Sequence, residues 1–155
     1  MTPFWAWLEA TSVGQAVQGS LQVTAVLSAV HVAGMTLVAG SALVSSLRLL
    51  GALFPDAPAR EVTRGARAGL LVGLALSIST GVLLFSARAT AAVENDFFRL
   101  KMLLLAGAIL FHAVWYNRLL LADGRPSART RVGGAVSLTL WMGVVGSACA
   151  YILLE

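Results

Sequence analysis

The sequence has little charge, only two histidines and a single cysteine, and these scarcities exclude most kinds of soluble protein. Only 12% of its 155 residues are charged, whereas 58% are hydrophobic, and the mean hydropathy is +0.83. A soluble domain of this length needs a charged surface that this composition does not provide. The one cysteine, Cys149, has no second cysteine to pair with, which excludes a disulfide within the chain.

Long apolar runs account for the excess of hydrophobic residues. Each has about 20 residues or more, enough to cross roughly 30 Å of hydrocarbon at 1.5 Å per residue. We therefore predict an all-α integral membrane protein with one four-span domain over residues 1–155, folded as an up-down-up-down bundle. The predicted segments are a short interfacial N-terminal helix within 1–19 and spans over about 21–50, 66–88, 98–121 and 132–154.

Lysine and arginine are absent from the N- and C-terminal segments and unevenly distributed among the loops. The first and third loop regions hold eight of them and the second holds three. The positive-inside rule places the first and third loops in the cytoplasm. We therefore expect a multi-pass membrane protein whose N- and C-termini face outward, to the periplasm in a Gram-negative cell, in contact with membrane lipid and not with nucleic acid. The eight are Arg48, Arg60, Arg64, Arg67, Arg118, Arg125, Arg129 and Arg131.

Acidic residues are absent from all four predicted spans. A proton or ion transporter with a carboxylate relay is therefore not supported. The sequence also holds no nucleophile–base constellation, no glycine-rich phosphate loop and no loop with clustered metal ligands. These absences favour an electron-transfer or accessory membrane protein over a stand-alone enzyme.

Small residues recur at every fourth position along the second span. Such a ridge lets two helix backbones approach closely in lipid, so tight helix packing is the first interpretation. A second interpretation is that Gly69 and Gly73, with Gly34 of the first span, leave room for a flat cofactor. The ridge consists of Gly65, Gly69, Gly73, Ser77 and Gly81.

The two histidines, His31 and His112, lie within the first and third predicted spans. Ionisable side chains are costly there and usually face the bundle interior, where they serve a function. His31 follows Leu21 by 10 residues and His112 follows Met102 by 10, which places both about 15 Å from the outer ends of their spans. Because these spans run in the same direction, we expect the two rings to face each other at matched depth.

Two inward imidazoles at matched depth favour one haem b per protomer, with His31 and His112 as axial ligands. Arg99 and Lys101, near the outer end of the third span, would bind the haem propionates. The predicted function is a small b-type cytochrome, or the haem-bearing membrane subunit of a larger complex. It would transfer electrons between the quinone pool and a periplasmic redox protein.

Two other interpretations of the histidines stay open. A copper-handling membrane protein would combine His31 with Met35, four residues further along the same helix, and with Met102 as soft ligands for Cu(I). A structural or assembly subunit, present as a homo-oligomer or in a larger membrane complex, would have no cofactor. Each histidine would then make an interhelical hydrogen bond worth about 1 kcal/mol or less.

Four stretches carry a resemblance to a known family. In their order and spacing they resemble the bacterial four-span inner-membrane proteins of the uncharacterised family DUF6644, over most of residues 8–112. That family is distantly similar to the membrane cytochromes b561 and the copper-resistance D membrane proteins, which are helical bundles with intramembrane histidines. The resemblance implies functional roles for His31 and His112. Where the family often has an acid before "LRLLG", this chain has Ser45 and Ser46. The stretches are "LEAT", "VHVAGMTLVAGSALVSSLRLLG", "TGVLLFSA" and "FFRLKMLLLAGAILFH".

Overall fold

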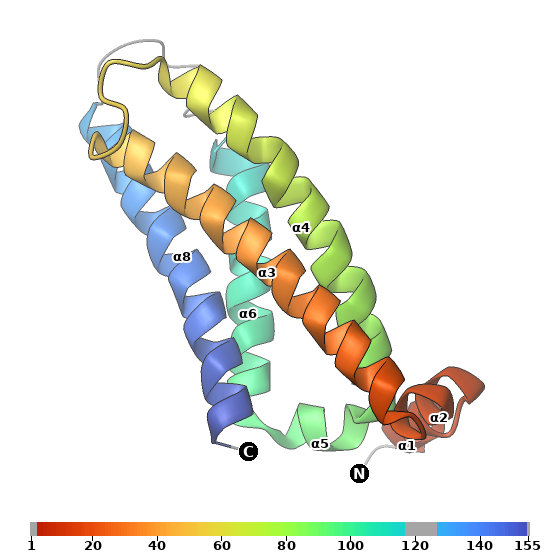
Figure 1. Cartoon of the computed structure of the whole chain (residues 1–155). Helices are drawn as coiled ribbons and strands as arrows, with labels where there is room; N and C mark the ends of the chain where they lie inside the picture. The colour runs from red at the N-terminus through yellow and green to blue at the C-terminus, as the bar shows by residue number, and fades with distance from the viewer. Residues whose placement is uncertain (1–2, 117–126, 155) are drawn as a thin grey trace.

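A computed structural model describes residues 3–116 and 127–154, and this part of the chain is helical with no strands. Four helices are long and apolar enough to cross a membrane, which confirms the predicted all-α membrane bundle. They alternate in direction, with α3 between α4 and α8 in Figure 1 and α6 behind them. The four are α3 (Leu21–Leu50), α4 (Ala59–Ala87), α6 (Asp96–Phe111) and α8 (Ala128–Leu153).

The two ends of the bundle carry different structures. The end that holds the N- and C-termini, which we call the terminal end, also holds three short helices (Figure 1). These are α1 (Pro3–Glu9), α2 (Ser12–Gln18) and α5 (Ala89–Glu94). The opposite end, which we call the arginine-rich end, holds the loop between α3 and α4 and the start of α8. Its described arginines are Arg48, Arg60, Arg64, Arg67, Arg129 and Arg131.

The observed helices extend beyond several predicted spans. Helix α4 begins at Ala59 and α8 at Ala128, before the predicted starts at 66 and 132, because helical hydrogen bonding continues into polar residues that hydropathy excludes. The third span continues from α6 into a π-helix, η1 (His112–Tyr116), and its predicted end over 117–121 lies outside the described residues. The interfacial segment is two helices rather than one, and the second predicted loop contains α5.

Side-chain caps fix where the helices start. Ser20 Oγ accepts a backbone N–H of the first turn of α3, and Asn95 Oδ1 accepts two at the start of α6. Helix α3 ends at Gly51, whose φ of 80° lies in the left-handed region that glycine adopts without a Cβ clash.

The N-terminal helices are tied to the corner between α4 and α5. Glu9 Oε1 accepts the backbone N–H of Thr90 at 2.7 Å, which caps the start of α5. Gln18 Nε2 donates to the Ala87 carbonyl at 2.6 Å, at the end of α4. The N-terminal segment therefore braces the terminal end of the bundle rather than forming a separate arm.

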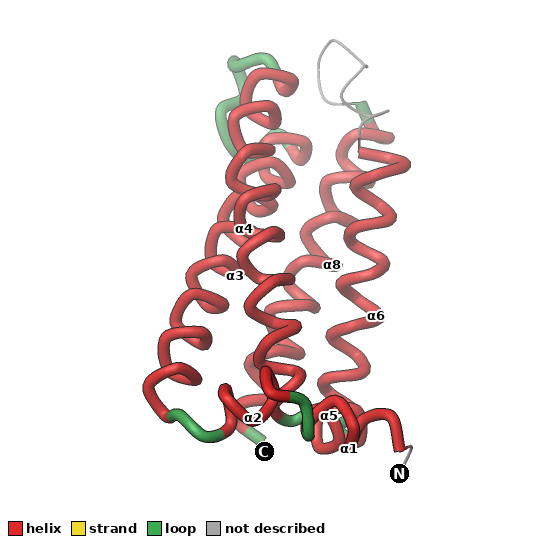
Figure 2. The backbone as a smooth tube through the Cα atoms, turned by 90° about the vertical axis from the view of Figure 1, so that its right-hand side faces the viewer, coloured by secondary structure: helices red, strands yellow, loops and turns green. Residues whose placement is uncertain are grey.

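The four long helices pack as two pairs. Helix α3 packs along α4 and also against α8, and α8 packs along α6. Among the described residues, α4 and α6 make no close backbone contact. Figure 2 shows the α3–α4 pair on the left and α6 on the right. The bundle is thus held together mainly through the α3–α8 contact.

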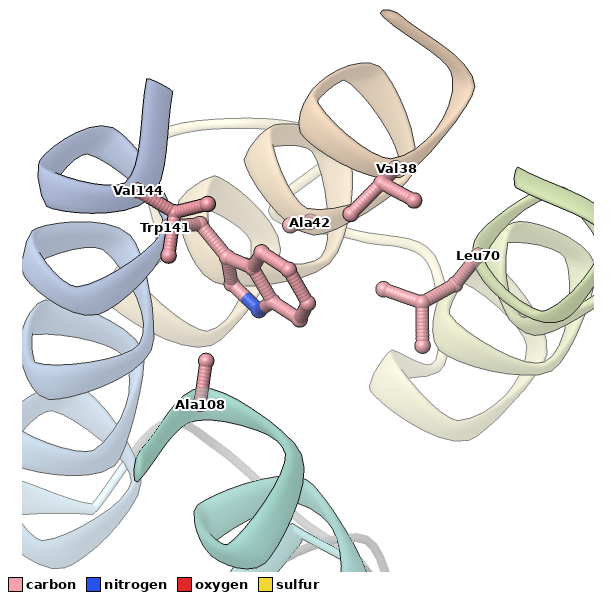
Figure 3. Packing of buried hydrophobic residues seen from close by; sticks show 6 residues of the cluster. All are labelled: Val38, Ala42, Leu70, Ala108, Trp141 and Val144. Atoms are coloured by element: carbon pink, nitrogen blue, oxygen red, sulfur yellow. The ribbon is translucent and has the colours of Figure 1, made fainter. Parts of the chain in front are cut away.

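An apolar cluster in the middle of the bundle joins all four helices (Figure 3). Trp141 is its largest member and only 1% exposed, and its ring reaches from α8 towards the other three helices. A buried ring of this size makes many van der Waals contacts with the residues around it, and such packing holds transmembrane helices together in lipid. The cluster consists of Val38, Ala42, Leu70, Ala108, Trp141 and Val144.

Candidate functional site

The small-residue ridge of the second span packs α4 against α3. A Cβ atom at Gly73 would lie 2.7 Å from the carbonyl oxygen of Gly34, and one at Gly69 would lie 2.5 Å from Ser41 Oγ. These approaches leave no room for a larger side chain, as expected for helices that pack closely in lipid. The prediction that Gly34, Gly69 and Gly73 make room for a flat cofactor is therefore corrected, because the neighbouring helix fills that space.

His31 is hydrogen-bonded to α4 near the terminal end. Its Nδ1 lies 3.1 Å from Thr80 Oγ1, and the Thr80 hydroxyl itself donates to the Leu76 carbonyl. Because that hydroxyl hydrogen is already used, Thr80 accepts from His31, and the neutral imidazole carries its proton on Nδ1. Nε2 then presents a lone pair. The ring covers Gly81, where a Cβ would lie 3.1 Å from His31 Cε1.

His112 is engaged by a different helix. Trp141 Nε1–H donates to His112 Nδ1 at 3.4 Å, and the two rings meet edge to face with centroids 5.7 Å apart. A neutral imidazole that accepts at Nδ1 carries its proton on Nε2, the reverse of His31. Since Trp141 belongs to the apolar cluster, His112 lies beside the middle of the bundle.

The two histidines lie at different depths. Ser46 Oγ donates to Ser137 Oγ at 3.0 Å, which aligns these residues of the antiparallel α3 and α8. Trp141 is four residues further along α8 and is therefore level with Ala42, its neighbour in the apolar cluster. His31 precedes Ala42 by 11 residues, which is about 16 Å along the helix axis at 1.5 Å per residue. His31 therefore lies about 16 Å from the level of Trp141, the hydrogen-bond partner of His112.

This separation corrects the prediction that His31 and His112 face each other at matched depth. Metal–imidazole bonds are about 2 Å long, so two nitrogens on one metal ion lie about 4 Å apart at most. A haem bound by both histidines of one chain does not fit this arrangement. The reason is the helix register: among the described residues α3 and α6 make no backbone contact, and α6 begins at Asp96, six residues before the Met102 from which the depth of His112 was counted.

The residues predicted for copper do not converge either. Met35 packs against the apolar cluster, whereas Met102 lines a surface groove beside Trp5. Within residues 3–116 and 127–154, no three His, Cys, Asp or Glu side chains are grouped as a metal site. Cys149 is exposed on the surface of α8.

A series of aromatic rings crosses the terminal end of the bundle. Trp5 of α1 meets Phe85 of α4 edge to face, with centroids 5.5 Å apart. Phe85 stacks on Phe98 of α6, with ring centroids 5.5 Å apart and an interplanar angle of 8°. The centroid of the Phe98 ring lies 5.9 Å from that of Tyr151 of α8. The Phe85–Phe98 stack therefore joins α4 and α6 through side chains, although their backbones are apart.

Lys101 lies one helical turn inside this stack, near the level of the His31 ring. Gly81, which His31 covers, precedes Phe85 by four residues, and Lys101 follows Phe98 by three, so both lie on the inner side of the stacked pair. The Lys101 ammonium lies 5.5 Å from the Phe98 ring centroid. In the described part of the chain, Lys101 forms no ion pair.

We call this arrangement the His31–Lys101 site, defined by His31, Thr80, Gly81, Phe85, Phe98 and Lys101. It combines a nitrogen lone pair, a cation without a described counter-ion and two stacked rings. Arg99, predicted to act with Lys101 on haem propionates, lies elsewhere: its side chain is 61% exposed on the outside of α6. The structure thus assigns Arg99 and Lys101 to different faces of one helix.

Two partners of the histidines were missed by sequence reasoning. Thr80 lies between Ser77 and Gly81 of the small-residue ridge, so its position beside the ridge was a usable signal. Trp141 is the only tryptophan of the fourth span and lies four residues after Ser137 on one helical face. Which of the two would meet which histidine depends on how far each helix is shifted along its neighbour.

Comparison with known proteins identifies a family and no activity. No curated protein matches the chain. No solved structure matches it either. The similarity to the cytochromes b561 and copper-resistance D proteins therefore stays a prediction. One family model, described as a family of unknown function (DUF6644), matches residues 4–152. Because this match covers nearly the whole chain, the protein belongs to the DUF6644 family, as the four quoted stretches predict, and the match extends beyond the residues 8–112 that carried the resemblance.

Proposed function

We propose that this chain is a membrane subunit that binds the head group of a lipid-soluble quinone at the His31–Lys101 site. One observation carries the proposal: Gly81, which the His31 ring covers, and Lys101 both lie about one helical turn inside the stacked Phe85–Phe98 pair. A quinone head group is a flat ring with oxygens on opposite sides. In the quinol form, one hydroxyl would donate to Nε2, while the other oxygen would accept from Lys101.

The packing of the helices supports entry of such a ligand from the lipid. Helices α4 and α6 are not packed backbone to backbone, and side chains of the aromatic series bridge them at the terminal end. A ligand with a long apolar tail would reach the His31–Lys101 site between these two helices. Mostly apolar linings with a few placed polar groups are typical of small-molecule sites.

The chain would act with a partner that carries a redox centre. Oxidation of a quinol releases two protons and two electrons; His31 Nε2 would accept one proton and water the other, and the partner's centre would take the electrons one at a time. The arginine distribution supports a cytoplasmic arginine-rich end and a periplasmic terminal end. The partner would therefore dock at the terminal end, in the periplasm of a bacterial cell.

His31 also supports a second candidate, a haem with only one axial ligand from this chain. Metal-bound histidines usually donate their other ring N–H to a second group, as His31 does to Thr80. Such a haem would supply a one-electron redox centre. Its second axial ligand would come from outside the chain, because His112 lies at another depth.

Titration of the detergent-purified chain with short-chain ubiquinone and menaquinone analogues tests the proposal. Quenching of tryptophan fluorescence would report binding, since Trp5 contacts Phe85 at the edge of the site. We expect His31→Gln and Lys101→Met to weaken binding at least tenfold. The matched control His112→Gln keeps an acceptor for Trp141 and should bind as the original chain does.

Equal loss in His31→Gln and His112→Gln, or no binding to the original chain, would overturn the quinone proposal. An optical spectrum of the same preparations tests the second candidate. Reduced α and β bands that disappear in His31→Gln and persist in His112→Gln would support haem on His31. Bands that persist in both variants, or that are absent with haem supplied during expression, would exclude it.

A further inference from the structure

A surface groove at the terminal end lies outside the proposed quinone site. It has a volume of about 620 Å³ and is formed by α1, α5 and the first turns of α6. Its lining residues are Trp5, Val93, Phe98, Arg99, Met102 and Leu103. Apart from the Phe98 ring, none of these side chains belongs to the His31–Lys101 site.

The rim of the groove presents a fixed guanidinium. Arg99 Nε donates to the Val93 carbonyl at 2.6 Å, which holds the side chain against the end of α5. Its Nη1 lies 3.4 Å from Asp96 Oδ1, and that carboxylate is 92% exposed, so the pair is weak. Nη2 has no hydrogen-bond partner among the residues that the structure describes. The guanidinium therefore has donors to offer an anion, and it suits the bidentate geometry of a phosphate.

The floor of the groove is apolar and runs along the helix axis. Met102 follows Phe98 by four residues and Leu103 follows Arg99 by four, so each pair shares a helical face. Leu103 is 72% exposed and Met102 47%, both on the side of α6 that faces lipid. Over one turn of α6 the groove thus changes from a cationic rim to an apolar floor.

We infer that this groove binds one anionic phospholipid, with its phosphate on Arg99 and an acyl chain along Met102 and Leu103. The charge of the rim selects an anionic head group, and the apolar floor requires a chain attached to it. The direction of the change, from polar at the bundle end to apolar towards its middle, matches a lipid in its own leaflet. Trp5 closes one side with an aromatic ring of the kind enriched at membrane interfaces.

Thermal unfolding of the full chain in a non-ionic detergent, with added lipid, tests the inference. We expect phosphatidylglycerol to raise the melting temperature in a saturable way and phosphatidylcholine with the same acyl chains to have less than one fifth of the effect. Arg99→Gln should remove this difference between the lipids. Arg67→Gln, which removes an exposed arginine of α4 at the opposite end, should keep it.

Three results would overturn the inference. The first is an equal response to the two lipids in the original chain. The second is an equal loss in Arg99→Gln and Arg67→Gln, which would show that total charge and not the groove is responsible. The third is saturation by glycerol 3-phosphate alone, because a head group without chains would then be sufficient. Native mass spectrometry of the same variants, counting bound phosphatidylglycerol, keeps the test independent of any change in folding stability.

Discussion

His31 and His112 are the same residue type in helices of similar composition, yet the structure gives them different neighbours. His31 donates through Nδ1 to a threonine of α4, which leaves the lone pair on Nε2. His112 accepts from a tryptophan of α8 that fills the apolar cluster. One ring therefore has a nitrogen to offer to a ligand, and the other is part of the packed middle of the bundle.

The difference shows that an intramembrane histidine does not by itself mark a ligand site. The cost of burying the ring is offset in both cases by a hydrogen bond to a neighbouring helix. His31 differs from His112 in two further neighbours near its level: Lys101, which has no described counter-ion, and the stacked Phe85–Phe98 pair. The variants that follow alter these surroundings one at a time.

Trp141→Ala should have the largest effect, because it empties the centre of the apolar cluster and leaves His112 Nδ1 without its donor. Large-to-small substitutions of buried tryptophan cost about 3–5 kcal/mol. Unfolding by SDS in mixed micelles would measure the change, with Met142→Ala as the control on the exposed side of the same helix. Equal stabilities of the two variants would contradict the assignment of His112 to a packed core.

Gly73→Leu should have the second-largest effect on stability, because the leucine side chain would push α3 away from α4, the helix to which His31 is hydrogen-bonded. A Cβ at Gly73 would lie 2.7 Å from the Gly34 carbonyl oxygen, and overpacking of this kind costs about 1–3 kcal/mol. Gly40→Leu is a matched control on α3, because a Cβ there meets nothing within 4 Å. The same unfolding assay should show a loss for the first variant and none for the second.

Phe98→Leu should weaken the bridge between α4 and α6 by a smaller amount. It removes the stack on Phe85 and the tilted ring contact with Tyr151, and aromatic pairs contribute about 0.5–1.5 kcal/mol beyond their buried area. Distance measurements between spin labels on α4 and α6 should then show a wider distribution at the terminal end. An unchanged distribution would mean that the stack does not hold these helices together.

Thr80→Val should have the smallest effect on stability, about 0.6 kcal/mol, the average for interhelical hydrogen bonds in membranes. Its consequence for His31 should be larger, because the ring loses the acceptor that keeps its proton on Nδ1. Nitrogen NMR of labelled histidine in lipid nanodiscs would detect a mixture of tautomers for His31 and no change for His112.

Thr80→Ser supplies the control for this last prediction. Serine keeps the hydroxyl that accepts from His31, so the His31 signal should stay that of the Nδ1–H form. A shift in Thr80→Ser as large as that in Thr80→Val would contradict the role given to the hydroxyl.

Much of the fold follows from the sequence because it depends on properties that act residue by residue. Apolar length fixes the four spans, and polar residues such as Ser20 and Asn95 fix helix starts by capping backbone N–H groups. The four-residue spacing of the ridge that includes Gly69 and Gly73 indicated close helix packing, which the α3–α4 contact shows. Helix α5 was missed because its six residues carry no periodic pattern long enough to recognise.

The candidate site depends on longer-range geometry. Counting 10 residues from Leu21 and from Met102 placed His31 and His112 at one depth, and this was wrong because α6 begins six residues before Met102 and no backbone contact fixes it against α3. Their relative level is set by two successive contacts, α3 with α8 through Ser46 and Ser137, and α8 with α6 through Trp141. Neither contact has a signature in the sequence of one helix alone.

The sequence by itself determined that this protein crosses the membrane four times, which polar residues can cap its helices, and which two side chains are too costly to be inside a span without a partner. Those properties follow from hydropathy, capping and charge, which belong to single residues and short segments. Only the tertiary structure decided that His31 meets Thr80, that His112 meets Trp141, and that Lys101 and Arg99 serve different faces of α6. The physical reason is that helix register is fixed by side-chain packing between helices, where a shift of one turn exchanges every neighbour.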